Sequence, residues 1–174
     1  MIPDHTFFGN QLEKAIDGKT YAYDYVVIGN TPGKYELRFH FVSSNSTFRE
    51  AFTLTLCKYK GKMWIDGRAV KLGNRVFQTF IFEYKKAPDD FVVTLEPKQL
   101  DMVTISCCVA DEDAGLWEDD DIIVGPDGME HDRIIREVVC VEPKGNNKYR
   151  VFCNDHECDD DFDDLIFDME IITK

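Results

Sequence analysis

The sequence lacks the features that mark several common protein classes. It has no run of about 18 apolar residues that could cross a bilayer, and residues 1–18 mix polar and apolar side chains instead of forming a basic and then apolar leader. We therefore expect a soluble, cytoplasmic protein. No linker rich in Gly, Ser or Pro and no fixed repeat divides the chain, so residues 1–174 are expected to form a single domain.

Catalytic signatures are also missing. The sequence has four histidines, which are scattered, and it has neither a nucleophile elbow nor a phosphate-binding loop. Carboxylate-rich loops without a neighbouring His or Lys do not define a general acid and a general base. We therefore expect a protein that is not an enzyme.

The cysteines do not by themselves indicate a disulfide framework, because an even number has little meaning in a chain of this size. Four of them lie in strand-like runs. We expect those four to be buried free side chains, since free Cys is among the most buried residue types. The six cysteines are Cys57, Cys107, Cys108, Cys140, Cys153 and Cys158.

Negative charge is confined to the last third of the chain. Residues 1–110 hold 14 Lys and Arg against 12 Asp and Glu, whereas residues 111–174 hold 6 against 21, which gives the net charge of −13. The acidic third cannot neutralise phosphates, and the remainder lacks a basic stripe. Nucleic-acid binding is therefore not expected.

Alternating polarity predicts β-structure over most of the chain. In residues 35–41 Tyr35, Leu37, Phe39 and Phe41 alternate with polar residues, the pattern of a half-buried strand. The turn signal NTPG before that run predicts a hairpin, and Lys60-Gly61 predicts a second one. Further strand-like runs occupy residues 74–84, 90–97, 101–111, 136–142, 148–153 and 164–172.

Eight to ten short antiparallel strands predict an all-β sandwich, since two amphipathic sheets can bury their apolar faces against each other. A closed barrel is the alternative. Helix is scarce: residues 10–18 and 129–137 are the two candidates for short helices.

The most specific feature is an acidic stretch that follows a strand, VADEDAGLWEDDDIIVG at residues 109–125. It holds five aspartates within eleven residues: Asp111, Asp113, Asp119, Asp120 and Asp121. Carboxylates about 5 Å apart repel by roughly 0.8 kcal/mol per pair in bulk water. Because Ca²⁺ accepts about six to eight oxygen ligands in flexible geometry, it would remove that repulsion. The stretch therefore predicts Ca²⁺ ligands at these five positions.

This stretch resembles the third calcium loop of the C2 domains, which are β-sandwiches that dock on membranes or partner proteins. In that family a strand is followed by Asp-x-Asp, a spacer, Asp, two apolar residues and Gly. Residues 109–125 follow this order, with the Ile122-Ile123 pair two positions late, and the Asn-x-x-Phe of residues 74–77 is similar to the family's preceding strand. The resemblance implies a C2-like sandwich that binds Ca²⁺ and, through it, a membrane or a protein.

A second acidic stretch offers an EF-hand spacing. Asp159, Asp161, Asp163 and Glu170 fall at positions 1, 3, 5 and 12 of such a loop. However, Asp164 stands where the loop requires Gly, and the strand pattern of residues 164–172 already explains Glu170. We therefore do not favour an EF-hand.

The same stretch contains three possible zinc ligands, Cys153, His156 and Cys158. A fourth would have to come from afar, from His131 or Cys140, and structural zinc sites usually have two paired ligand clusters. Zinc is the less favoured interpretation.

The two acidic stretches are expected to lie apart. If each strand from residue 103 onward reverses the next, they fall at opposite ends of the sandwich. They meet only if residues 122–130 do not cross the sheet as a strand, which Gly125, Pro126 and Gly128 permit. A shared site is therefore a hypothesis that a structure can test.

The alternative to an ion is a basic protein. A concentrated negative field steers a cationic partner, so an inhibitor or immunity-type protein that binds a basic toxin or nuclease is the second hypothesis. A third is that the acidic loops only keep the fold soluble. Trp117 lies between acidic clusters and would be a natural aromatic anchor for a partner. The other candidate partner-binding residues are Glu118, Asp159, Asp160, Asp161 and Asp163.

Overall fold

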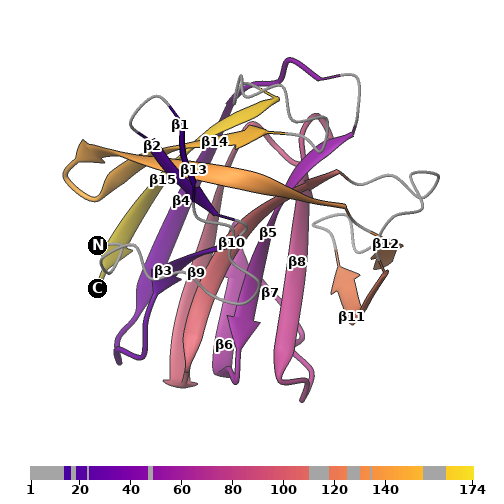
Figure 1. Ribbon diagram of the computed structural model, residues 1–174. Helices are drawn as coiled ribbons and strands as arrows, with labels where there is room; N and C mark the ends of the chain where they lie inside the picture. Colours follow the sequence, from indigo (N-terminus) through magenta and orange to yellow (C-terminus); the bar gives the residue numbers. More distant parts are fainter. Residues whose placement is uncertain are drawn as a thin grey trace.

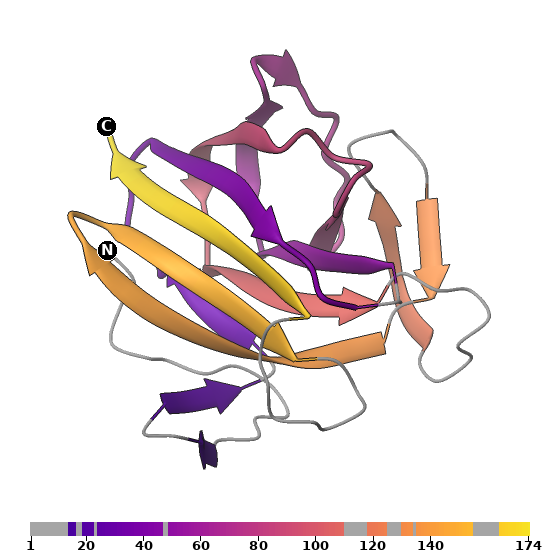
Figure 2. The same cartoon turned by 90° about the horizontal axis from the view of Figure 1, so that it is seen from above.

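The computed structural model describes residues 14–16, 19–22, 24–46, 49–109, 118–124, 130–133, 135–154 and 164–174. These residues form fifteen β-strands in two sheets that pack face to face (Figures 1 and 2). The predicted all-β, sandwich-like architecture is confirmed. Among the described residues no helix has the length and hydrophobicity needed to cross a membrane.

Sheet A contains nine strands, and every pair of neighbours in it is antiparallel. Their order across the sheet is β1 (Lys14–Ile16), β2 (Lys19–Ala22), β13 (Ile135–Gly145), β14 (Lys148–Asn154), β15 (Leu165–Thr173), β4 (Tyr35–Ser43), β9 (Asp90–Gln99), β6 (Lys60–Ile65) and β7 (Arg68–Ala69).

Sheet B contains the other six strands. Their order is β3 (Asp24–Ile28), β10 (Met102–Val109), β5 (Glu50–Cys57), β8 (Phe77–Glu83), β11 (Glu118–Val124) and β12 (Glu130–Arg133). The pair β8–β11 is parallel and the other pairs are antiparallel. The first residues of β13 also pair with β10, beside β3, so β13 belongs to both sheets.

The predicted alternation is confirmed in the strands of sheet A. In β4 the side chains of Tyr35, Leu37, Phe39 and Phe41 are buried and those of Arg38 and His40 are exposed. In β15 buried apolar residues alternate with half-buried ones from Leu165 to Ile171. A strand with one apolar face needs a facing sheet to bury it, which sheet B provides.

The core is centred on six phenylalanines from five strands. Their ring centroids lie between 4.2 Å, for Phe52 and Phe167, and 6.4 Å, for Phe41 and Phe167. Aromatic pairs at such distances add about 0.5–1.5 kcal/mol each beyond the burial of their area. The six are Phe39, Phe41, Phe52, Phe82, Phe91 and Phe167. Through this cluster, β4, β9 and β15 of sheet A pack against β5 and β8 of sheet B.

The prediction of two short helices was wrong, and the fifteen strands of the structure exceed the eight to ten expected. Residues 14–16 form β1, and residues 130–133 and 135–137 belong to β12 and β13. A short helix has little stability on its own. These segments instead form backbone hydrogen bonds with neighbouring strands. The extra strands lie at the margins of the two sheets and are β1, β2, β7, β11 and β12. All except β11 have two to four residues, too few to show a clear period.

Neither predicted hairpin forms. The NTPG turn joins β3 of sheet B to β4 of sheet A, and β5 and β6 likewise lie in different sheets. Gly61 lies inside β6, at a bulge opposite Pro97, with φ of +150°, and an added Cβ would collide with the carbonyl oxygen of Glu96. A turn signal shows that the chain reverses, but a strand with one apolar face is buried equally well by crossing to the facing sheet.

Burial of Tyr59 predicts a stability change at alkaline pH. Its hydroxyl donates a hydrogen bond of 2.5 Å to the carbonyl oxygen of Lys62, and burial raises the pKa of Tyr59 from 10.0 to about 12. The folded state therefore favours the neutral phenol. This contribution to stability is fully present below pH 10.0 and is lost as the pH rises through about 12.

We expect the free energy of unfolding to fall across this interval more steeply in the wild type than in Tyr59→Phe. The measurement is denaturant unfolding at a series of pH values. Equal pH dependence in the two proteins would show that Tyr59 is not the group responsible.

Candidate functional site

Both acidic segments leave the sheets at the same end of the sandwich. The first, residues 110–134, leaves after Val109 of β10 and returns at Ile135 of β13; these two residues pair with each other. The second, residues 154–164, leaves as β14 ends and returns at β15, where Cys153 pairs with Leu165. We call this the acidic end: the end of the fold marked by Glu50, Val109, Ile135, Cys153 and Leu165.

Strand β13 brings the two segments together. Ile135 pairs with Val109 of β10, and Val138, three residues later, pairs with Asn154 of β14. Three residues of a strand span about 10 Å. The expected placement at opposite ends is therefore wrong for the strands that flank the segments. It failed because residues 118–124 and 130–133 form β11 and β12 at the far edge of sheet B instead of a strand next to β10.

A disulfide cross-links the strands from which the two segments depart. Cys107 of β10 and Cys153 of β14 are joined, with their Cα atoms 5.9 Å apart, and both are fully buried. Next to it the backbone N–H of Asp164 donates a hydrogen bond of 3.2 Å to the carbonyl oxygen of Cys153. The starting points of both acidic segments are thus fixed relative to each other.

This bond corrects the expectation for the cysteines. Cys57, Cys108 and Cys140 are buried and form no disulfide, as expected for cysteines in strand-like runs, whereas Cys107 and Cys153 are joined to each other. Strand register, which places these two opposite each other across two sheets, is not visible in the sequence. The expected cytoplasmic location stays a prediction.

All the buried carboxylates of the described side chains lie at the acidic end. Glu83 accepts a hydrogen bond of 2.6 Å from Arg49 Nε and is 3.2 Å from Lys86 Nζ. A buried carboxylate is costly without such partners. The set comprises Asp24, Glu50, Glu83 and Asp164. The sequence analysis missed this set, because single acidic residues at strand ends carry no pattern.

Most predicted ligand and partner residues lie outside the described residues. These are Asp111, Asp113, Trp117, Asp159, Asp160, Asp161 and Asp163. Glu118, Asp119, Asp120 and Asp121 belong by their backbone to β11, whose first residue, Glu118, pairs with Arg133 of β12. Their assignment as ligands or partner contacts stays a prediction.

The described side chains restrict the metal sites that are possible. No three Asp, Glu, His or Cys residues among them come together as a metal site. Cys153 is engaged in the disulfide and cannot serve as a zinc ligand. Glu170 lies in β15 opposite Lys148, which agrees with the strand interpretation over the EF-hand. A cation at the acidic end would therefore depend on ligands from the acidic segments.

The outer face of sheet A carries a row of alternating charge that the sequence analysis did not anticipate. Glu142, Arg150, Asp168, His40 and Asp90 lie side by side on five successive strands. Arg150 donates two hydrogen bonds to Asp168, of 2.8 and 3.1 Å, which raise the pKa of its guanidinium. His40 Nδ1 is 2.8 Å from Asp90 Oδ1. The row borders a hollow of about 460 Å³, where Arg150 and Asp168 are engaged with each other.

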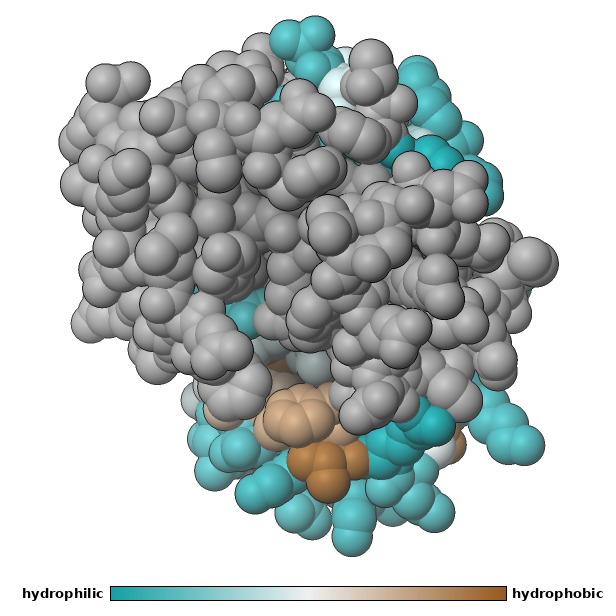
Figure 3. All heavy atoms as spheres, turned by 45° about the vertical axis from the view of Figure 1, so that its right-hand side comes forward, coloured by the Kyte–Doolittle hydropathy of each residue, from teal (hydrophilic) through white to brown (hydrophobic). Residues whose placement is uncertain are grey.

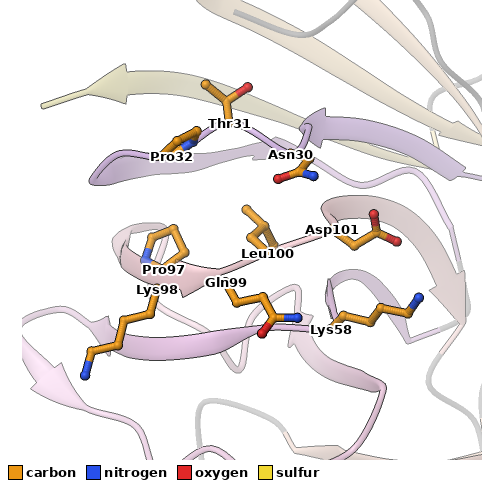
Figure 4. Close-up of a pocket in the computed structure, with 9 residues that line it drawn as sticks. All are labelled: Asn30, Thr31, Pro32, Lys58, Pro97, Lys98, Gln99, Leu100 and Asp101. Atoms are coloured by element: carbon orange, nitrogen blue, oxygen red, sulfur yellow. The ribbon is translucent and has the colours of Figure 1, made fainter.

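A smaller hollow of about 290 Å³ lies at the opposite end, between the connections β3–β4, β5–β6 and β9–β10. Figure 4 shows the Lys58 and Lys98 side chains extending away from one another instead of converging on a ligand. Figure 3 shows mostly hydrophilic described atoms on the face it presents, with a small hydrophobic patch near its lower edge. The acidic end is therefore the strongest candidate site.

No protein-family model, curated protein or solved structure matches this chain. The geometry of the acidic end therefore carries the functional argument.

Removing the disulfide is expected to destabilise the fold. The bond closes a loop with a sequence separation of 46 residues, for which chain entropy predicts a contribution of about 4 kcal/mol. We expect Cys107→Ala/Cys153→Ala to lower the free energy of unfolding by roughly 2–4 kcal/mol, measured by denaturant titration.

The matched control is Cys108→Ala/Cys140→Ala, which removes two buried sulfur atoms that are not in a disulfide. If the two double variants lose equal stability, the bond contributes nothing beyond the packing of its sulfur atoms.

Proposed function

We propose that this chain is a non-catalytic binding module whose acidic end takes up Ca²⁺ and, through the ion, engages a protein or membrane surface. The observation that supports this proposal is the convergence of the strands that flank both acidic segments. These strands are joined by the Cys107–Cys153 bond. An ion with about six to eight oxygen ligands is served best by carboxylates from more than one segment.

The proposal assigns ligands to both segments. Asp111 and Asp113 follow β10 closely, and Asp159 and Asp161 lie in the connection between β14 and β15. The fixed stems limit the conformations available to each connection, which lowers the entropy lost when an ion gathers their carboxylates. The C2-like order of residues 109–125 is part of this proposal. Asp119–Asp121 lie in β11, whereas the resemblance implies that they belong to a loop.

The test is thermal unfolding with Ca²⁺, Mg²⁺ or chelator. Ca²⁺ should raise the melting temperature by mass action, with about 2.7 kcal/mol gained at a hundred times Kd, and Mg²⁺ should raise it less. For a shared site, Asp111→Asn/Asp113→Asn and Asp159→Asn/Asp161→Asn should each remove most of the shift. The variant that combines all four changes should lose little more.

The control is Glu96→Gln/Glu142→Gln, which removes the same amount of charge away from the acidic end and should keep the full shift. Absence of Ca²⁺ binding at millimolar concentration in calorimetry would end the proposal.

The amount of charge supports a second candidate, an inhibitor or immunity-type protein that binds a basic partner. Residues 110–134 hold ten Asp and Glu and one Arg, and residues 154–164 hold seven Asp and Glu with no Lys or Arg. Because each Ca²⁺ carries only two charges, one or two ions would leave most of this charge in place. The remaining field would attract a cationic surface and raise its association rate.

For this candidate, polylysine should bind the protein in the presence of chelator, with an association rate that falls steeply with salt. Stopped-flow fluorescence measures the rate. Binding that requires Ca²⁺ would favour the first candidate, and binding without salt dependence would contradict the second.

A further inference from the structure

The protein has a basic edge that its net charge conceals. Residues 58–75 hold six Lys and Arg and a single acidic residue, Asp66. Five of the six have exposed side chains that form no ion pair with any described carboxylate: Lys58, Lys60, Lys62, Arg68 and Lys71. We call these five residues the basic edge.

Cations elsewhere on the sandwich are mostly neutralised. Arg38 is 3.0 Å from Glu36, Lys144 is 2.6 Å from Glu142, and Arg150 is 2.8 Å from Asp168. The unpaired positive charge is therefore concentrated along β6, β7 and their connections. A cluster of unpaired cations repels itself and is stabilised by an anionic partner.

The geometry of β6 leaves it open to such a partner. Along Lys60–Lys62, β9 is the one described strand that pairs with β6, since β7 pairs only with Trp64 and Ile65. Trp64 is half-buried on this strand, and Lys34 Nζ lies 5.6 Å from its ring centre. An edge strand with free backbone groups can accept a further strand, and cations along it select an acidic one.

The opposite edge of the strand path has the opposite charge. The path of paired strands runs from β12 to β7. Its first two strands, β11 and β12, belong to residues 118–133, which hold seven Asp and Glu and one Arg. Figure 1 shows this β11–β12 hairpin at the far side of β8, away from β6 and β7. The two edges are thus complementary in charge but cannot meet within one molecule.

We propose that the basic edge docks the acidic β11–β12 hairpin of a second copy of this chain. The inference rests on the proposed function in taking the acidic segments as a binding surface. A second copy, like any polyanion, is repelled at long range by the net charge of −13, so the contact depends on short-range attraction between the two edges. A short hairpin instead meets the basic edge locally, within a Debye length of about 8 Å at physiological salt. Because the two surfaces differ, the contact is head to tail and extends into a ring or an open chain.

A charge-swap experiment tests the contact by sedimentation velocity at low and at physiological ionic strength. The wild type should self-associate with increasing concentration, less so at higher salt. Lys60→Glu/Lys62→Glu and Asp119→Lys/Asp120→Lys should each be monomeric alone, because each reverses two charges in one of the two complementary surfaces and so weakens their attraction. Their mixture should associate again, since each edge of one variant then faces an opposite charge on the other.

The matched control is Lys144→Glu/Lys148→Glu, which makes the same charge change on the β13–β14 hairpin and should associate like the wild type. A monomeric wild type at every concentration, a mixture that stays monomeric, or an equal effect of the control would each overturn the proposal. So would monomers that bind anionic vesicles through Lys60 and Lys62.

Calorimetry with Ca²⁺ on Lys60→Glu/Lys62→Glu separates this inference from the proposed function. Normal Ca²⁺ binding with no self-association in the wild type removes the inference alone. Self-association without Ca²⁺ binding supports the inference and removes the calcium proposal.

Discussion

The arrangement of the molecule depends on one strand that belongs to both sheets. The first residues of β13 pair with β10 in sheet B, and its later residues pair with β14 in sheet A. This double pairing holds β10 and β14 close enough for Cys107 and Cys153 to join. It also places the departure of both acidic segments at one end. Without it the two segments would start from sheets linked only through side-chain packing.

Three rings of the phenylalanine cluster lie next to the acidic end. Phe41, Phe52 and Phe167 lie in the halves of their strands nearest this end, with Phe52 and Phe167 only 4.2 Å apart. Rigid packing beneath the segments keeps their stems in place. Glu83 is buried at the same end and depends on Arg49 and Lys86 for compensation. At this end, an aromatic core therefore lies next to buried and exposed charged side chains.

Residue periodicity was sufficient to predict the class of fold but not the pairing of its strands. The alternation in β4 and β15 identified both strands and their buried faces. The turn signals at residues 30–33 and 60–61 did not identify which strands pair with each other, because the consecutive strands at these turns lie in different sheets. The placement of the acidic segments was wrong because β11 and β12 pair beside β8 and not beside β10. The disulfide and the charge row on sheet A depend on register, which alternation within a single strand does not contain.

The two proposed binding partners of the acidic residues, Ca²⁺ and the basic edge of a second copy, would compete with each other. Asp119–Asp121 are expected calcium ligands, and they also lie in the hairpin that we infer to dock on the basic edge of a second copy. Calcium bound there would reduce the negative charge that the basic edge meets. By linkage, an ion that weakens self-association must itself bind more weakly to the associated form, by the same factor. Under both proposals, assembly and ion uptake would depend on each other through Asp119–Asp121.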